Sequence, residues 1–248
     1  MEWSDDAIVL SLRPHGESSG ILEALTRDHG RHLGLVRGGS ASKGRATLQP
    51  GNRVKLTWRA RLSEHLGVYT VELARARAAD MFEQRAALWG LNALSTVAAA
   101  VLPEREPHEA AYEGADALLD AIAGHDFADW APLFVRWEIG LLNELGFGLD
   151  LARCAATGAA DDLIYVSPRT GRAVSREAGE PYRDRLLALP SFLLGRQAGE
   201  AGAGDLLAGL QLTAHFLEQW VLMPHQKTMP EARARLTDLA ARAAGELA

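Results

Sequence analysis

The sequence predicts a mixed α+β protein in which a small β-barrel comes first and a mainly α-helical domain with a small β-hairpin insertion follows. Between residues 7 and 77, short apolar runs alternate with turn residues, whereas alanine, leucine and a helical period dominate afterwards. Charge divides at the same place, because residues 1–78 carry a net charge of +4 and the remainder −10. We therefore expect two domains, residues 1–78 and 79–248, with the insertion at about residues 151–182.

Five segments of the first domain have the composition of β-strands and are separated by glycine, proline and aspartate, which favour turns. The predicted strands are residues 7–12, 21–26, 33–36, 54–58 and 67–73. Five strands in about 75 residues, joined by links of hairpin length, predict a small closed barrel. The OB-fold has this size and strand number.

The second domain has apolar residues at the three, four and seven spacing of helices with one buried face. Helices are predicted at residues 81–102, 109–123, 130–145, 183–194, 206–221 and 231–244. The apolar stripe is clearest from Trp130 to Leu145, and we interpret it as core rather than as a binding face. Residues 195–204, rich in glycine and alanine, predict a flexible joint.

The insertion interrupts this helical pattern. Residues 163–166 favour a strand, residues 167–171 favour a turn, and residues 172–174 return as a second strand. A small β-hairpin is therefore expected between the third and fourth predicted helices.

Composition indicates a soluble globular protein. Hydrophobic residues make up 48% of the chain, without an uninterrupted apolar run long enough to span a bilayer. The N-terminal residues are acidic where a secretion signal would be basic. The single cysteine, Cys154, excludes an intrachain disulfide and fits a reducing compartment, so we expect a cytoplasmic protein.

Motifs typical of catalysis are missing from the sequence, including the phosphate-binding loop, the nucleophile elbow and the dinucleotide fingerprint. His29 and His32 have a spacing seen in some metal sites, but a hairpin turn lies between them and a third ligand is not near. Cys154 lacks a neighbouring base, which favours an inert buried thiol over a nucleophile. We expect no catalytic residue, no metal and no cofactor, and a protein that is not an enzyme.

Residues 27–61 are strongly basic within an otherwise acidic chain. Nine lysines and arginines occur there, with Asp28 as the single acid. Such charge on a small barrel predicts a surface that binds polyanions, while a solvated strand face is the alternative that charge alone leaves open. The residues expected to contact phosphates are Arg37, Lys43, Arg45, Lys55, Arg59 and Arg61. Arg31 and Arg53 border turns and rank below this set.

Alternation along residues 54–59 separates an inner face from an outer face. It predicts Trp58 in the core and Lys55 and Arg59 outside. Trp58 and Tyr69 are the aromatic residues considered for base stacking, which contributes roughly 1–3 kcal/mol per base. With Trp58 inside, binding is expected to rest on charge, which favours sequence-independent contact.

Several short motifs follow one another along nearly the whole chain. They are His15-Gly-Glu17, Leu25-Thr-Arg-Asp-His-Gly30, Leu35-Val-Arg-Gly-Gly39, Leu48-Gln-Pro-Gly51, Phe134-x-x-Trp-Glu-x-x-Leu-Leu-x-Glu-Leu-Gly146 and Leu151-x-x-Cys154. In this order they resemble the RecO family of bacterial recombination mediators, which act in the RecF pathway. The segment from Tyr165 to Val174 looks like the variant found in alphaproteobacterial members.

The resemblance implies an N-terminal OB-fold, a helical body and a zinc-ribbon-like insertion. It implies binding to single- and double-stranded DNA, annealing of complementary strands, and help in loading recombinase. The implied partners are RecR and the acidic C-terminal tail of single-strand DNA-binding protein. Arg183 with Arg185, or Arg233 with Arg235, are the alternatives for a contact with that tail.

The sequence departs from the family at the insertion. Many members carry four zinc-ligating cysteines in Cys-x-x-Cys pairs, whereas here Thr157 occupies the second position after Cys154 and no cysteine follows. One thiolate cannot build a tetrahedral sulfur site, so a degenerate, metal-free hairpin is expected.

Two functional hypotheses from different classes follow. In the first, the chain is a mediator that binds and anneals DNA. In the second, it is an adaptor whose barrel mainly binds partner proteins. An enzyme with an unrecognised site would need catalytic groups that the motifs do not reveal.

Overall fold

The computed structural model describes residues 1–39, 42–195 and 201–245, and of Ser42 and Lys43 it describes the backbone alone. The chain forms two compact units, residues 1–126 and residues 127–248. The domain boundary expected at residue 78 falls inside the first of these units. That residues 1–78 form a domain of their own remains a prediction. Residues 196–200, half of the joint predicted at 195–204, lie outside the described part of the chain.

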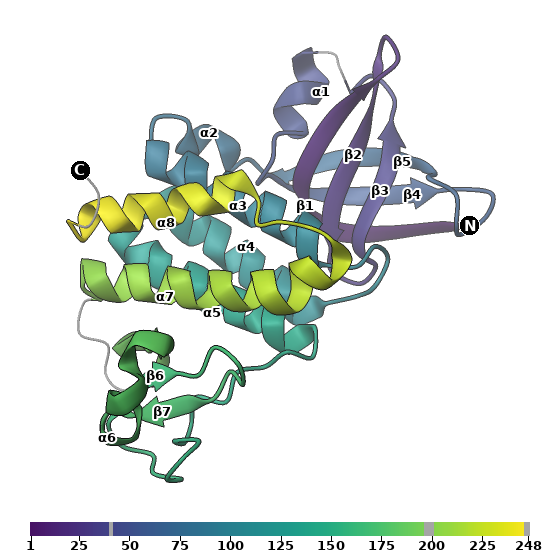
Figure 1. Ribbon diagram of the computed structural model, residues 1–248. Coiled ribbons are helices and arrows are strands. Elements are labelled where there is room, and N and C mark those ends of the chain that lie inside the picture. The colour runs from purple at the N-terminus through teal and green to yellow at the C-terminus, as the bar shows by residue number, and fades with distance from the viewer. Residues whose placement is uncertain (40–41, 196–200, 246–248) are drawn as a thin grey trace. The chain divides into compact units, whose positions relative to one another are not determined.

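The first unit begins with a closed β-barrel, as Figure 1 shows. Its strands are β1 (Glu2–His15), β2 (Ser19–Thr26), β3 (Gly30–Val36), β4 (Arg53–Arg59) and β5 (Val68–Arg75). Around the barrel the order is β1-β2-β3-β5-β4, and only the β3–β5 pair is parallel. A short helix, α1 (Ser42–Thr47), connects β3 to β4. The α+β class and the five-stranded OB-type barrel are confirmed.

The barrel core follows the alternation of the strands. In β4, Val54, Leu56 and Trp58 are buried, whereas Lys55 and Arg59 are exposed, so the predicted placement of Trp58 is confirmed. Inward-facing side chains of β1, β2, β3 and β5, together with Leu48, complete the core.

Aromatic and polar side chains fill one end of the barrel interior. Trp3 stacks on His29 at 4.0 Å between ring centroids and on Trp58 at 5.6 Å. Buried His32 hydrogen-bonds the Tyr69 hydroxyl through Nδ1 at 2.8 Å. Burial, followed by the charge of Arg105, lowers the pKa of His32 to about 4. These contacts give His29 and His32 structural roles.

Three helices complete the first unit: α2 (Ala78–Met81), α3 (Arg85–Val101) and α4 (Glu109–Gly124). The single helix predicted at residues 81–102 is interrupted between α2 and α3. The loop after α3 lies against the barrel, because the Arg105 N–H donates to the Arg31 carbonyl at 2.8 Å. A Cβ at Gly30 would lie 2.0 Å from the Glu106 carbonyl oxygen, so this approach requires glycine.

The second unit packs the helices α5 (Phe127–Glu144), α7 (Ala203–Phe216) and α8 (Glu231–Ala243) beside one another (Figure 1). A π-helical segment, η3 (Leu217–Leu222), and a short 3₁₀ turn, η4 (Met223–His225), continue α7. The aromatic stripe of α5 is core, as predicted, although Leu133 is 40% exposed.

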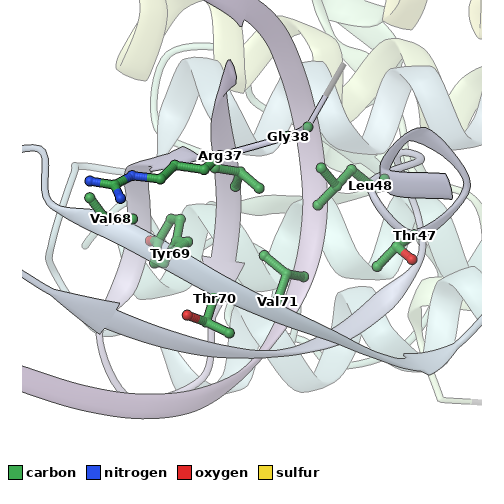
Figure 2. A pocket seen from close by; sticks show the side chains of 11 residues that line it. Arg37, Gly38, Thr47, Leu48, Val68, Tyr69, Thr70 and Val71 are labelled. Carbon is green, nitrogen blue, oxygen red and sulfur yellow. The ribbon is translucent and has the colours of Figure 1, made fainter. Parts of the chain in front are cut away.

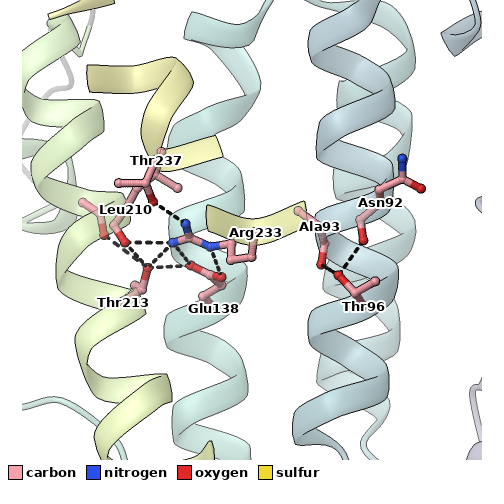
Figure 3. A network of polar contacts seen from close by, with 9 residues as sticks. Asn92, Ala93, Thr96, Glu138, Leu210, Thr213, Arg233 and Thr237 are labelled. Atoms are coloured by element: carbon pink, nitrogen blue, oxygen red, sulfur yellow. Dashed lines mark hydrogen bonds and ion pairs between the residues drawn. The ribbon is translucent and has the colours of Figure 1, made fainter. Parts of the chain in front are cut away.

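A fully buried ion pair joins these three helices, as Figure 3 shows. The guanidinium of Arg233 in α8 donates to both carboxylate oxygens of Glu138 in α5, at 2.6 and 2.8 Å. It also donates to the Leu210 carbonyl of α7 at 2.8 Å and to the Thr237 hydroxyl at 2.9 Å. Several acceptors therefore offset the cost of burying its charge.

A small sheet lies between α5 and α7 in the sequence. Its order is β7-β6-β8, from β6 (Leu163–Val166), β7 (Ala173–Ser175) and β8 (Leu187–Ala188), and the predicted hairpin is confirmed as β6 and β7. The helix predicted at residues 183–194 is wrong. After the short helix α6 (Arg176–Gly179), that region contains the end of η1 (Glu180–Arg185), then β8 and η2 (Ser191–Leu193), because pairing with β6 takes up the backbone of β8.

Among the described residues, no helix is both long and apolar enough to cross a bilayer.

Candidate nucleic-acid interface

The predicted phosphate-contacting residues lie at separate places on the first unit. Arg37 follows β3, Arg45 belongs to α1, Lys55 and Arg59 lie on β4, and Arg61 follows β4. All five are exposed. The side chain of Lys43 lies outside what the structure describes.

Helix α4 pairs with most of the other arginines of the barrel. Its carboxylates at residues 109, 113, 116 and 120 share one face, because their spacing follows the helical turn. The pairs are Arg27–Glu109 (2.9 Å), Arg27–Glu113 (3.0 Å), Arg53–Asp116 (3.3 Å), Arg75–Asp120 (2.6 Å), Arg77–Asp116 (2.8 Å) and Arg77–Asp120 (2.6 Å). We call this surface the acidic face of α4. The arginines bound to it already have anionic partners.

Arg27 and Arg31 are two arginines of the barrel that already have anionic partners, on α4 for Arg27 and on β2 for Arg31. The hydrogen bond to Glu109, followed by the charge of Glu113, holds the pKa of Arg27 above its ordinary value. Arg31 pairs with Glu23 at 2.6 Å and donates to the Leu102 carbonyl at 2.8 Å.

The residues expected to contact phosphates also divide into those with and those without an ion pair. Within the described residues, Arg37, Arg45, Lys55 and Arg61 form no ion pair, whereas Arg59 pairs with Glu2 at 2.8 Å. Lys55 lies opposite Asp6 on β1 and Glu72 on β5 in the strand registers. Acids therefore surround the β4 members of the set, and the positive field there is weak.

Arg37 and Arg45 border two hollows on the α1 side of the barrel. A hollow of about 650 Å³ borders Arg37, α1 and the start of β5 (Figure 2). A second hollow of about 280 Å³ borders Arg45 and the ends of β1 and β2. Gly39 and Leu48 line both hollows. The structure thus brings two of the predicted residues together around α1.

Sequence reasoning missed Arg13, which is exposed and forms no ion pair among the described residues. It lies between Leu12 and Pro14, which line the hollow that Arg45 borders. The signal available in the sequence was a basic residue next to the proline that ends an apolar run.

Base stacking on the two aromatic residues considered is limited by burial. Trp58 is 2% exposed and donates from Nε1 to the Leu66 carbonyl at 3.0 Å. Tyr69 is 3% exposed. Its ring packs directly against Gly34, where a Cβ would lie 2.3 Å from the ring.

The insertion contains the single thiol. Cys154 is buried, and its Sγ accepts hydrogen bonds from the backbone N–H and the hydroxyl of Ser175 at 3.3 and 3.4 Å. Burial alone would raise the pKa of this thiol, but hydrogen bonds from Ser175 and Thr157 outweigh it and lower the pKa to about 6. Protein donors thus supply the polar contacts around the sulfur.

The four-cysteine zinc site implied by the family resemblance does not fit these residues. Thr157 occupies the position of the second cysteine and offers a hydroxyl, which is not a usual zinc ligand. Within residues 1–39, 42–195 and 201–245, no group of three histidine, cysteine or acidic residues is placed to hold a metal ion.

A closed five-stranded barrel with a short helix between β3 and β4 defines an OB-fold protein joined to a helical unit, and exposed arginines lie beside that helix. Residues 1–77 match the family model of the Recombination protein O N terminal domain, and residues 83–229 match that of the C-terminal domain. The chain belongs to the RecO family of DNA repair proteins.

Curated relatives support the same assignment, and each carries the name DNA repair protein RecO. The Rhodospirillum centenum protein is 54% identical over 96% of this chain and 94% of its own length. The Phenylobacterium zucineum protein is 53% identical over 96% and 97%, and the Caulobacter vibrioides protein is 50% identical over 98% and 99%.

Proposed function

We propose that this chain is a DNA repair and homologous recombination mediator of the RecF pathway. In this role it binds single- and double-stranded DNA without sequence specificity, anneals complementary strands, and helps load recombinase on DNA coated by single-strand DNA-binding protein. It acts in the cytoplasm, on the nucleoid during repair, and it catalyses no reaction. Family membership supports this proposal.

The observation that carries the proposal is the contrast between paired and unpaired arginines. Arg27, Arg53, Arg75 and Arg77 are bound by the acidic face of α4, whereas Arg37 and Arg45 remain without an anionic partner among the described residues. A phosphate backbone is a partner that offsets such charge by displacing condensed counterions. We therefore assign the DNA contact to the α1 side of the barrel.

Annealing requires no acid, base or nucleophile. Two strands repel each other through their phosphates, and cations on a small surface reduce that repulsion while the bases find their complements. Contacts to phosphate carry little sequence information, which suits a protein that must act on any strand.

For the partner proteins, the proposal includes RecR and the acidic tail of single-strand DNA-binding protein. Arg233 is fully buried against Glu138, so it cannot contact the acidic tail, and the proposal does not include the pair of Arg233 and Arg235. Arg183 and Arg185 are exposed and follow Tyr182, which is 60% exposed, and Arg183 also pairs with the exposed Glu180 at 3.3 Å. A cationic pair beside an exposed aromatic ring suits an acidic tail with an apolar end.

The proposal is tested by strand annealing with the wild type and the Lys43→Glu/Arg45→Glu variant. We expect the variant to lose most of its annealing while it retains binding to RecR. Unchanged annealing together with lost RecR binding would instead support the adaptor hypothesis. A wild-type protein that binds no DNA at low salt would contradict the mediator.

A further inference from the structure

The hollow beside Arg37 lies next to the shortest strand pairing of the barrel, the one between β3 and β5. Strand β3 pairs with β5 only through Leu35–Val68 and Val36–Tyr69. The described part of β3 ends at Val36, so from Thr70 onwards the β5 edge on this side has no neighbouring strand. Its backbone N–H and C=O groups can therefore serve as hydrogen-bonding partners for another molecule.

The described walls of this hollow combine apolar surface with the cation of Arg37. Leu48 faces Val71 and Tyr69 across it, and Arg37 extends along its rim towards Val68, as Figure 2 shows. The volume of about 650 Å³ lies within the range of about 300–1,000 Å³ of small-molecule sites. The site thus offers apolar walls, a polar strand edge and a guanidinium that forms no ion pair with the described residues.

We propose that this hollow receives one unpaired nucleobase of a DNA single strand, while Arg37 binds an adjoining phosphate. A nucleobase has apolar faces for the Leu48 and Val71 walls and a polar edge for the β5 backbone. The inference rests on the proposed DNA-binding function and goes beyond charge, because it gives the barrel a means of distinguishing single from double strands. A base stacked and paired in a duplex cannot enter.

The surrounding charge favours a nucleic acid over a peptide strand as the occupant. Arg45 borders the second hollow, and the exposed Arg13 lies in sequence between two of its lining residues, Leu12 and Pro14. Neither arginine forms an ion pair among the described residues. A phosphodiester chain that runs from one hollow to the other meets guanidinium groups both before and after the base. Repeated anionic charge at each unit is a property of DNA and not of an ordinary peptide.

The test compares two oligonucleotides of equal length and charge, one of thymidine and one with abasic sites throughout. For the wild type we expect the thymidine strand to bind at least about fivefold more tightly, the lower end of the effect of one contacted base. Val71→Phe and Thr47→Trp fill the hollow from two different elements. Both should reduce that ratio to about one without weakening binding to the abasic strand, which depends on charge alone.

Thr57→Trp is the matched control, because Thr57 lies on β4 and does not line the hollow, and it should keep the wild-type ratio. Circular dichroism and thermal unfolding establish that the variants are folded. Equal wild-type binding of the two strands, or blocked variants that keep the ratio, would overturn the inference. If the blocked variants keep the ratio and lose a partner protein instead, a peptide occupies the edge and the inference is again overturned. Failure of both strands to bind the wild type at low salt would contradict the proposed function itself.

Discussion

The Nε atom of Arg77 lies 2.6 Å from Oδ1 of Asp120, and this contact joins the residue just after the barrel to the last turns of α4. Arg77 is 1% exposed, and it also pairs with Asp116 at 2.8 Å. The acidic face of α4 therefore has a buried anchor at one end. Towards the other end, its contact with Arg27 lies at the exposed surface.

Replacing the buried anchor should be far more costly than replacing an exposed neighbour. Arg77→Ala removes the buried partner of two carboxylates, which keep only the more exposed Arg53 and Arg75, and we expect a loss of about 3 kcal/mol in the free energy of unfolding. Arg75→Ala is the matched control, since Arg75 is exposed and pairs with the same Asp120, and it should cost less than about 1 kcal/mol. Urea denaturation of both variants measures the difference, and equal losses would contradict the anchoring role of Arg77.

Releasing an arginine from the acidic face of α4 should strengthen DNA binding. In Glu109→Gln/Glu113→Gln, Arg27 loses both anionic partners and becomes available to a phosphate. We expect the log–log salt dependence of single-strand binding to steepen by about 0.7, the contribution of one neutralised phosphate. An unchanged slope would show that Arg27 lies away from the path of the DNA. The same substitutions combined with Arg27→Ala should restore the wild-type slope.

The buried histidine should make the barrel less stable in mild acid. The pKa of His32 is lowered to about 4 by burial and then by Arg105, whereas the unfolded chain binds this proton at the ordinary pKa of about 6.5. Between these values the unfolded state holds more protons, so the free energy of unfolding falls as the pH falls, by up to about 3 kcal/mol.

His32→Gln removes this titration. Urea denaturation at a series of pH values between neutrality and mild acid should give a shallower fall for the variant than for the wild type. The slopes are compared rather than the absolute stabilities, because the substitution also changes the contact with Tyr69. Parallel slopes would contradict a neutral, buried His32.

Metal removal should leave the insertion intact. Because hydrogen bonds from Ser175 satisfy the Cys154 sulfur, a chelator should not change the melting temperature, and purified protein should hold far less than one zinc per chain. Cys154→Ala should cost about 1–3 kcal/mol, since it leaves buried donors of Ser175 unsatisfied. Cys154→Ser retains an acceptor and should cost less. Stoichiometric zinc, or a melting temperature that drops with chelator, would contradict this account.

Local sequence patterns predicted the barrel well, but they did not predict contacts between residues far apart in the sequence. Alternation alone placed Trp58 inside, because neighbouring residues on a strand face opposite sides. The helix predicted at residues 183–194 failed because β8 pairs with β6, a contact that no local period records. Arg37 and Arg27 look alike in sequence, and only the fold reveals that the partners of Arg27 lie 82 and 86 positions further along the chain.

The central claim is that unpaired arginines beside α1, and not those bound by α4, contact DNA. The most direct measurement is the salt dependence of single-strand binding for the wild type, Arg37→Ala/Arg45→Ala and the paired control Arg27→Ala/Arg75→Ala. We predict that the first variant lowers the log–log slope by about 1.4, two phosphates at about 0.7 each, while the control retains the wild-type slope. Equal effects in both variants, or a slope that falls only in the control, would contradict the claim.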